Sequence, residues 1–409
     1  MARKSDKNLV VGLDVGTSNI TALVGLIGPD GKIEVVGVGR HPSHGLKRAE
    51  VVNIEATVQA TQRAVEEAEL MAGCEIRSVF TGIAGSHVKG LNSHGIVAIR
   101  DSEVSQYDID RVIDAAKAVA IPADQKILHI LPQEFIVDER DGVRDPVGMS
   151  GVRLEAKVHM ITGAVSAAQN VEKCVRHCGL QVSDMILGQI ASSEAVLIDD
   201  EKELGVCLVD IGGGTSDMAI FTKGAIRHTA AIPIAGDQVT NDIAVALRTP
   251  AQAAEEIKKN HGSVLAGNAT LNDMIEVPSV GGRPGRKIPR KTLVEVITAR
   301  YEELFTLIRS ELRRSGFEEL IAGGVVLTGG ATKIEGVLEL AESVLRMPVR
   351  LGVPQQVVGI REVVDNAAFA TSIGLLHYGH QHYLQGSEYM SGTGKGMFRR
   401  LKKWFQGNF

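Results

Sequence analysis

Aromatic side chains are scarce in this chain of 409 residues, where they make up 4% of the sequence and include a single tryptophan. Hydrophobic residues still reach 44%, so the core must be built mainly from Val, Ile, Leu and Ala. That composition favours an α/β fold in which helices pack on a sheet. Because the chain is too long for one compact core, two or more lobes are expected.

Long apolar runs and cysteines are scarce as well. No run of 18 or more apolar residues occurs, which argues against a membrane-spanning helix. The apolar segment near the start is interrupted at Asp14 and Gly16, so it does not resemble the core of a signal peptide. The four cysteines outline no disulfide framework. These features predict a cytoplasmic protein, and its net charge of −5 argues against a nucleic-acid partner.

The strongest chemical signal is a pair of glycine-rich turns, at Gly12–Ser18 and Val209–Asp217. In each, an apolar strand ends on an aspartate, Asp14 or Asp210, and then turns through glycine into hydroxyl residues. Glycine permits positive φ and lets backbone N–H groups converge on a phosphate with no Cβ in the way. An aspartate at the strand end can hold Mg²⁺ through its water ligands. Two such turns predict two related half-domains that close on one nucleotide.

The predicted elements repeat in the same order. Strands are expected at 9–14, 20–27 and 33–39, a helix at 54–71 and a strand at 79–83. The order returns with strands at 206–211, 217–221 and 225–232 and a helix from residue 237. Apolar alternation in the strands and an apolar stripe on the helix support these assignments. The repeat indicates an internal duplication.

Two insertions interrupt this duplication. The first, 85–162, has the size of a small domain and is expected to contain a helix at 109–119 and strands at 127–131, 134–137 and 154–161. The second, about 249–291, begins with a charged helix and ends in a basic, glycine-rich stretch that predicts a mobile loop.

The C-terminal third is predicted to return to the sheets before it ends in a linker. A long helix at 290–314 leads to a strand at 325–327 and a helix at 334–345. The Gly-, Ser-, His- and Gln-rich segment 379–395 has no apolar period and predicts a flexible linker.

A third glycine signal lies at Val326–Ala331, where Gly329 and Gly330 join an apolar strand to a helix. This arrangement is a flat backbone platform suited to a nucleoside or phosphate, although a tight strand-to-helix connection would look the same. Together, the three glycine signals in this order resemble the phosphate-1, phosphate-2 and adenosine motifs of the actin-like ATPase superfamily.

That resemblance implies a site for ATP and Mg²⁺. Mg²⁺ would be held through water by Asp14 and Asp210. The β-phosphate would be cradled by Gly16, Thr17 and Ser18, and the γ-phosphate by Gly212, Gly213, Gly214 and Thr215. The adenosine would be lined by Gly329, Gly330 and Ala331, with Glu255 and Lys258 as the superfamily's Glu-x-x-Lys pair. For Glu255 and Lys258, an ordinary solvated helix face is the alternative.

Hydrolysis requires a group that orients the attacking water. The superfamily places a Gln, Glu or Asp near the helix that links the lobes, and Gln189 is the matching candidate here. A surface amide is the alternative, and no glutamate stands where chaperone and filament relatives have one. The resemblance therefore implies ATP hydrolysis that is slow at most.

The chain ends in a second decisive pattern. At about 100° per residue, one helix face collects Met397, Phe398, Leu401, Trp404, Phe405 and Phe409, and the other collects Arg399, Arg400, Lys402 and Lys403. A basic amphipathic helix with bulky aromatics lies in a membrane interface and is attracted to anionic lipid. A helix docked on its own domain and a helix bound in a partner's groove are the alternatives.

The whole chain resembles the FtsA family of bacterial cell-division proteins, in the runs Val11–Thr17, Gly205–Thr215 and Val326–Ala331 and in the basic tail. The resemblance implies an α/β, actin-like ATPase fold with duplicated ribonuclease H-like lobes, an inserted subdomain and a C-terminal amphipathic helix. Subdomain 1A would span 1–84 (completed by about 360–380), 1C 85–162, 2A 163–235 (completed by about 305–359), 2B 236–304, a flexible linker 381–395 and the membrane helix 396–409.

Members of that family polymerise and tether FtsZ to the membrane. The implied partners are the FtsZ C-terminal peptide, further copies of the chain, anionic lipids and later division proteins at subdomain 1C. The peptide would meet a basic surface that contains Arg286, Arg290, Lys291 and Arg300. The implied location is the cytoplasmic face of the inner membrane at the division site.

Other proteins with this nucleotide fold remain as alternatives. An actin-like pilus-assembly or cell-shape protein shares the filament logic and, in some cases, a membrane helix. A sugar kinase would need a substrate pocket with a catalytic acid. A DnaK-type chaperone would need a peptide-binding domain after the ATPase, where this chain has only a short C-terminal segment.

Overall fold

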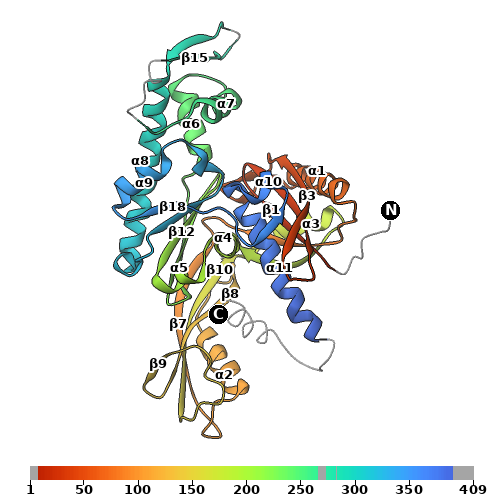
Figure 1. Ribbon diagram of the computed structural model, residues 1–409, viewed down its shortest axis with the longest axis vertical. Coiled ribbons are helices and arrows are strands. Elements are labelled where there is room, and N and C mark those ends of the chain that lie inside the picture. Colours follow the sequence, from red (N-terminus) through yellow and green to blue (C-terminus); the bar gives the residue numbers. More distant parts are fainter. Residues whose placement is uncertain (1–7, 266–272, 282, 390–409) are drawn as a thin grey trace.

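A computed structural model of the chain describes residues 8–265, 273–281 and 283–389. Two α/β lobes lie side by side, a small domain extends from their lower side, and helices topped by a β-hairpin rise on the opposite side (Figure 1). We call the lobe that contains β1 lobe I and the lobe that contains β12 lobe II.

Lobe I is built on a six-stranded sheet with the order β11-β6-β1-β2-β3-β19. Its strands are β1 (Leu9–Val15), β2 (Asn19–Ile27), β3 (Ile33–Pro42), β6 (Ser78–Ile83), β11 (Gln181–Leu187) and β19 (Val357–Gly359). The first three form antiparallel hairpins, and β6 runs parallel to β1. Helix α1 (Ile54–Ala72) packs closely on the sheet. The approach is so close that a Cβ added to Gly39 would lie 1.8 Å from the Ala64 carbonyl oxygen.

Lobe II repeats this topology. Its five strands follow the order β14-β13-β12-β17-β18, with β12 (Val206–Ile211), β13 (Ser216–Thr222), β14 (Ala225–Ile232), β17 (Val325–Thr328) and β18 (Val349–Leu351). Here too three antiparallel strands come first, and β17 runs parallel to β12. The predicted duplication is confirmed for the five strands that the two sheets have in common, while β19 is an addition to lobe I. Helix α9 (Val337–Leu345) packs beside the sheet of lobe II.

The predicted start of subdomain 2A at residue 163 is wrong. Helix α3 (Val165–His177) packs against α1, and β11 pairs with β6 in the sheet of lobe I. Residues 163–187 therefore complete lobe I, and lobe II begins near β12. The apolar pattern of β11 indicates a strand, but it carries no information about which of two similar sheets the strand will join.

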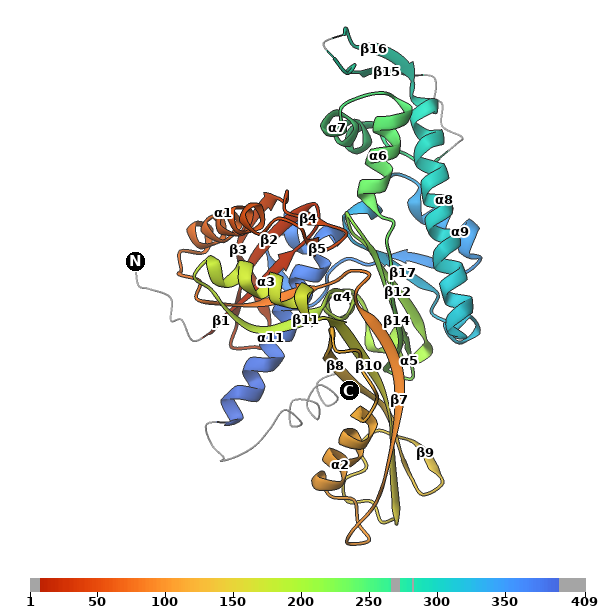
Figure 2. The same ribbon diagram turned by 180° about the vertical axis from the view of Figure 1, so that it is seen from behind.

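The inserted domain has its own sheet, with the order β7-β10-β8-β9. Its elements are β7 (Lys89–Ala98), α2 (Gln106–Lys117), β8 (Gln125–Val137), β9 (Arg140–Val143) and β10 (Arg153–Ala164). β7 was not predicted, and the two short strands expected at 127–131 and 134–137 are one continuous strand. The domain rests on lobe II, where His159 Nε2 lies 2.9 Å from Thr229 Oγ1 and the Gln133 amide donates to the Ile226 carbonyl at 2.9 Å. Figure 2 shows it below lobe II from behind.

The upper part of the molecule grows out of lobe II. It consists of α6 (Gly236–Ala246), α7 (Ala251–His261), the hairpin β15 (Met274–Val277) and β16 (Arg286–Pro289), and the first half of α8 (Arg290–Ser315). The predicted charged helix and long helix are both present. The described residues of the expected basic loop at 281–286 lie between β15 and β16, except for Arg286, which begins β16.

Shorter elements complete the described chain. They are β4 (Leu46–Lys47), β5 (Glu50–Val51), α5 (Asp199–Leu204), α10 (Arg361–Val364) and three 3-10 helices: η3 (Glu318–Leu320), η4 (Gly330–Lys333) and η5 (Ala367–Phe369). η4 ends at Lys333, just before the helix that was predicted from residue 334, and α9 begins three residues later than predicted, after Gly336 with its φ of +82°.

Two helices cross between the lobes, α4 (Gly188–Val196) and α11 (Ala370–Tyr389). They approach so closely that a Cβ added to Gly374 would lie 1.7 Å from the Ala191 carbonyl oxygen. On its other side α11 lies on β1, where a Cβ added to Gly12 would lie 2.9 Å from the Ser372 carbonyl oxygen. Glycine is thus required at both contacts for the lobes to share one central helix pair.

The flexible linker predicted from residue 381 is wrong up to Tyr389, because α11 continues to that residue. The helix starts in the core, where Ile373, Leu375 and Leu376 are fully buried. Extending an established helix costs much less than starting one, so polar residues can follow without an apolar period of their own. The rest of the expected linker and the expected membrane residues Met397–Phe405 lie outside the described residues. Within the described part of the chain, no helix is long and apolar enough to cross a membrane.

We expect Gly374→Ala to destabilise the protein by about 3 kcal/mol, because the new methyl group would force apart two backbones that are in contact. Gly188→Ala is the matched control, since its Cβ would have only ordinary contacts, at 3.6 Å from the Ala84 methyl group. Thermal melting of both variants checks the expectation. Equal melting temperatures would show that the crossing adjusts without cost.

Candidate nucleotide site between the lobes

The two predicted glycine turns contact each other near the crossing helices α4 and α11. A Cβ added to Gly213 would lie 1.9 Å from Ser18 Oγ, and one added to Gly214 would lie 2.6 Å from Thr17 Oγ1. Residues of the first turn belong to lobe I and residues of the second to lobe II. The structure therefore brings together two motifs that lie far apart in the sequence.

Both turns are built in the same way. The Gly16 N–H donates to the Asn19 carbonyl at 3.1 Å, and the Gly212 N–H donates to the Thr215 carbonyl at 3.0 Å. Each bond closes a hairpin between two antiparallel strands. Each connection is short and glycine-rich, which is the kind of backbone that binds phosphate through its N–H groups in other proteins.

Three carboxyl groups lie beneath the turns: Asp217 is buried, and Asp14 and Asp210 are half-buried. Burial raises the pKa of Asp14 to about 7, with the neighbouring charge of Asp210 as a second cause. Burial also raises the pKa of Asp210, although the Thr371 hydroxyl donates to its Oδ2 at 2.9 Å. Asp217, which faces Asp210 across the β12–β13 pair, has its pKa raised to about 7 by burial. These groups disfavour one another's charge unless a cation accompanies them.

The donor set suits a hydrated divalent cation better than a dehydrated one. Asp217 Oδ1 is buried without a hydrogen-bond partner, so one acceptor of the cluster is unused. The described residues include no group of three or more His, Cys, Asp or Glu side chains placed to bind a metal by themselves. Mg²⁺ commonly keeps several waters and binds through one or two carboxylates plus phosphate oxygens. Asp14 and Asp210 fit that requirement.

The third glycine signal lies against the second turn, next to Asp210 and Ile211. Gly329 has a φ of +93°, and a Cβ there would lie 2.4 Å from Asp210 Oδ1. Ala331 faces the start of α6, where its methyl carbon would lie 3.6 Å from a Cβ added to Gly236. The glycine at 329 is therefore required both by its backbone conformation and by the nearby carboxylate.

The pair Glu255 and Lys258 lies on α7 next to this segment. Their side chains form an ion pair at 2.6 Å, and the Lys258 side chain is only 11% exposed. Lys258 Nζ donates to the Gly236 carbonyl at 2.9 Å and to Thr240 Oγ1 at 2.8 Å. The alternative of a solvated helix face is wrong for Lys258, because three protein oxygens hold its ammonium group at the edge of the cleft.

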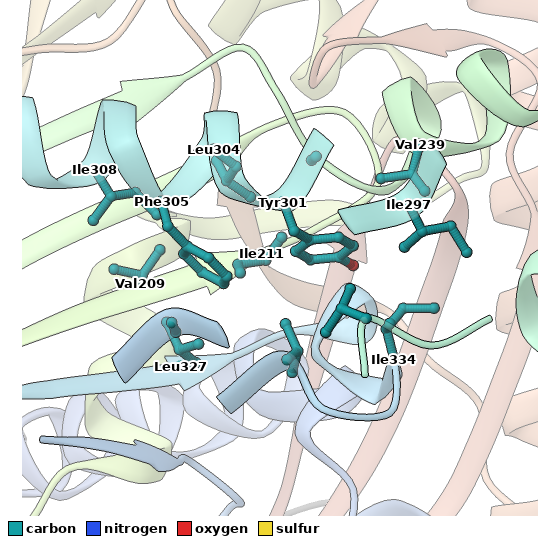
Figure 3. Packing of buried hydrophobic residues seen from close by; sticks show 14 of the residues in the cluster. Val209, Ile211, Val239, Ile297, Tyr301, Leu304, Phe305, Ile308, Leu327 and Ile334 are labelled. Atoms are coloured by element: carbon teal, nitrogen blue, oxygen red, sulfur yellow. The ribbon is translucent and has the colours of Figure 1, made fainter. Parts of the chain in front are cut away.

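A large cluster of buried apolar residues packs against the Gly329–Ala331 platform. Tyr301, on α8, is buried, and its hydroxyl donates to the Ala331 carbonyl at 2.7 Å. Figure 3 shows the ring among Ile297, Leu304 and Ile334. The tyrosine thus fixes the backbone of the Gly329–Ala331 segment, a role that the sequence did not indicate.

Gln189 lies in the first turn of α4 and is 2% exposed. Its Oε1 is buried and has no hydrogen-bond partner. The alternative of a surface amide is therefore wrong. An unused buried acceptor at the junction of the lobes is consistent with a contact to a water or ligand.

Several residues of the site were missed at the level of sequence. Thr371, on α11, holds Asp210, and the Ala49 N–H donates to Thr17 Oγ1 at 2.8 Å. Asp217 was part of a predicted motif but was assigned no role, and Asp237 was noted only as the start of a helix. Thr371 sits in a helix with an unremarkable sequence, and Ala49 acts through its backbone, so neither carries a signal in its side chain.

The four predicted peptide-binding cations lie on β16 and α8, and each already contacts another group of the protein. Arg286 donates to the Leu247 carbonyl, Arg290 pairs with Glu335 at 3.2 Å, and Lys291 pairs with Glu295 at 3.8 Å. The Arg300 guanidinium donates two hydrogen bonds to the Asp242 carboxylate, at 2.5 and 2.9 Å, and also forms an ion pair with Glu303. Each cation therefore already has a protein partner, so the expected surface is a mixture of charges.

Arg300 lines a groove between α6 and α8. The groove has a volume of about 370 Å³ and is lined by Asp242, Val245, Ala246, Val296, Ala299, Arg300 and Glu303. Val245 is 78% exposed. The groove therefore combines an apolar floor with a charged rim.

The sequence comparisons identify the family. A relative from Pseudomonas aeruginosa described as Cell division protein FtsA is 61% identical over the full length of both chains. This chain belongs to the FtsA family. The family model Cell division protein FtsA matches residues 207–374, and the model SHS2 domain inserted in FTSA matches residues 85–162. The predicted family resemblance is confirmed.

Solved structures of low sequence identity show the same fold as this chain. The PilM–PilN type IV pilus biogenesis complex matches with a TM-score of 0.66 and 16% identity, covering 91% of this chain and 98% of that one. MreB5 of Spiroplasma citri, described as bound to ADP, matches with a TM-score of 0.56 and 13% identity over 94% and 100% of the two chains. The predicted actin-like α/β fold with an inserted domain is confirmed.

Proposed function

We propose that this FtsA-family protein binds ATP and Mg²⁺ between its lobes, polymerises, and anchors FtsZ to the cytoplasmic face of the inner membrane. The observation that carries the nucleotide site is the meeting of Gly213 and Gly214 with Thr17 and Ser18 directly above the three carboxyl groups. In the described part of the chain, the fold gives no other reason for two glycine turns to contact each other across the lobes.

Within this site each motif has a role. The amides of Gly16–Ser18 and Gly212–Thr215 would bind phosphate oxygens, and Asp14 and Asp210 would hold Mg²⁺ through its waters. The bound cation would neutralise the phosphates and the carboxylates together. Glu255 and Lys258, with the Gly329–Ala331 platform, would bind the nucleoside. The ADP of the Spiroplasma protein, whose fold is the same, supports this choice of ligand.

The proposed site acts mainly as a latch. Gln189 is the group we assign to orienting a water, but it is an amide and cannot accept a proton as a carboxylate does. The nucleotide contacts belong to both lobes, so binding would favour one angle between them and one conformation for assembly. Hydrolysis, if it occurs, would be slow.

Membrane anchoring is assigned to residues 396–409. A single short amphipathic helix binds a membrane weakly. A filament of many subunits presents many such helices on one surface, and the high effective concentration multiplies the affinity. Assembly and membrane attachment would therefore support each other, while the inserted domain is left free to contact later division proteins.

The groove beside Arg300 is the proposed docking site for the C-terminal peptide of FtsZ. Its apolar floor would receive apolar side chains, and Arg300 would exchange part of its contact with Asp242 for an acid of the peptide. The three other predicted cations, Arg286, Arg290 and Lys291, would form the approach to this groove.

Arg300→Glu is expected to weaken binding of an FtsZ tail peptide at least about tenfold, because a repulsive charge replaces an attractive one at the rim. Arg314→Glu is the matched control, since it makes the same change at the far end of α8, where the side chain is 68% exposed. Fluorescence anisotropy with a labelled peptide measures both. If the two variants bind equally well, the peptide docks elsewhere.

A further inference from the structure

One contact in the cleft joins the lobes through a carboxylate. Ser18 of lobe I donates from its hydroxyl to Asp237 Oδ1 of lobe II at 3.2 Å. Asp237 lies in the first turn of α6, next to Gly236. The same Ser18 hydroxyl belongs to the turn that the proposed function assigns to a phosphate. The Asp237 carboxylate therefore holds the Ser18 hydroxyl, a group that a phosphate of the ligand would need.

The backbone keeps this carboxylate in position. The Asp237 N–H donates to the Gly213 carbonyl at 2.8 Å, and the Gly236 N–H donates to the Gly212 carbonyl at 3.1 Å. A Cβ added to Gly213 would lie 3.2 Å from Asp237 Oδ1. The start of α6 and the second glycine turn are thus one rigid unit, and the carboxylate stands directly over the turn.

The groups around the Asp237 carboxylate shift its pKa. Burial raises the pKa of Asp237, and the nearby charge of Glu255 acts in the same direction, while Ser18 and Lys258 oppose them. Among the groups that favour the ionised form, Ser18 is the one that belongs to the opposite lobe. Losing Ser18 to a ligand would leave the Asp237 carboxylate close to that ligand's own charge, in a site that is screened poorly by water.

We propose that Asp237 is an internal competitor of the nucleotide phosphates. It holds Ser18 and keeps the two glycine turns in contact. A nucleoside di- or triphosphate that takes over the Ser18 hydroxyl must break this bond and tolerate the nearby negative charge. Asp237 thereby lowers nucleotide affinity. This inference rests on the proposed nucleotide site.

The competition predicts that Asp237→Asn binds nucleotide about tenfold more tightly than the unchanged protein. Asparagine preserves the shape and the backbone bond to Gly213 but removes the charge. The gain should be present with Mg²⁺ and also in EDTA, because it arises from repulsion of phosphate. It should be larger for ATP than for ADP, since the triphosphate carries more charge.

The experiment is isothermal titration of the full chain with ADP and ATP, each with Mg²⁺ and with EDTA. Glu256→Gln is the matched control, because it removes an exposed acid from the neighbouring helix α7. Ser18→Ala and the Ser18→Ala/Asp237→Asn double variant complete a cycle. The cycle is expected to show that the gain from Asp237→Asn shrinks when Ser18 is absent.

The results of these titrations distinguish the proposed role of Asp237 from its alternatives. Unchanged affinity in Asp237→Asn would overturn the proposal, and so would weaker binding only in Mg²⁺, which would assign Asp237 to the water shell of the cation. If Asp237→Asn melts early, Asp237→Ser removes the same charge and is titrated instead. No nucleotide binding by the unchanged protein would contradict the proposed function itself, whereas binding with no effect at Asp237 would contradict this inference alone.

Discussion

Asp210→Ala is expected to lower the affinity for Mg²⁺-ATP by about 100-fold, the upper range for losing a group that orients the ligands of a metal. Asp210 is the penultimate residue of β12, faces Asp217 and receives a hydrogen bond from Thr371. It is therefore aimed by the fold at the point where the glycine turns meet. Titration of ATP in Mg²⁺ and in EDTA measures the effect, which should be largest in Mg²⁺.

Two controls make this result specific. Asp365→Ala removes an acid that is exposed and pairs only weakly with Arg361, at 3.3 Å, and should leave nucleotide affinity unchanged. Thr371→Val removes the hydrogen bond that positions Asp210 and should weaken binding by a smaller factor. The melting temperature of each variant shows that it is folded. An Asp210→Ala protein that is folded and binds Mg²⁺-ATP normally would refute the site.

Trp404→Glu is expected to reduce binding to anionic vesicles by roughly 100-fold, because it removes the largest apolar side chain of the tail and introduces a negative charge. Residue 404 lies outside the described residues, so the argument is based on the amphipathic pattern alone. Co-sedimentation with vesicles of anionic lipid measures the loss. ATP affinity should not change, because the cleft is built from other residues.

Gln406→Glu is the charge-matched control for the tail. It introduces the same charge on the polar face, where one charge near an anionic surface is worth about 1 kcal/mol, or roughly fivefold in affinity. The difference between the two variants isolates the apolar contribution of Trp404. If both lose the same amount, the tail binds by charge only, and equal sedimentation of Trp404→Glu and unchanged protein would rule out the membrane helix.

Local pattern was enough to find the elements that create the site. The strands at 206–211 and 225–232 were predicted with the bounds that the structure has, because alternating apolar residues and a glycine turn leave few other conformations. The nucleotide turns were found because phosphate-binding backbone requires glycine. In both cases the physical requirement acts on neighbours in the chain.

Errors occurred where a segment depends on distant partners. Residues 181–187 were placed in the wrong lobe, since both sheets offer a similar parallel edge. Residues 381–389 were taken for a linker, although the buried start of α11 extends the helix through them. For Gln189, a water-orienting role and a surface amide were both left open, and only the packing of α4 decided that its oxygen is buried.

By itself, the sequence determined the family, the duplicated α/β architecture and the residue types that make the glycine turns, because these follow from local backbone chemistry and from motifs that are continuous in the chain. Only the tertiary structure decided what the turns face. Folding brings Ser18 to Asp237 and Asp210 to Thr371, pairs that no local pattern connects, and burial between the lobes raises the pKa of the carboxyl groups there. The charge balance of the cleft is therefore a property of the assembled lobes, since it depends on distances and burial that exist only after the two halves have packed together.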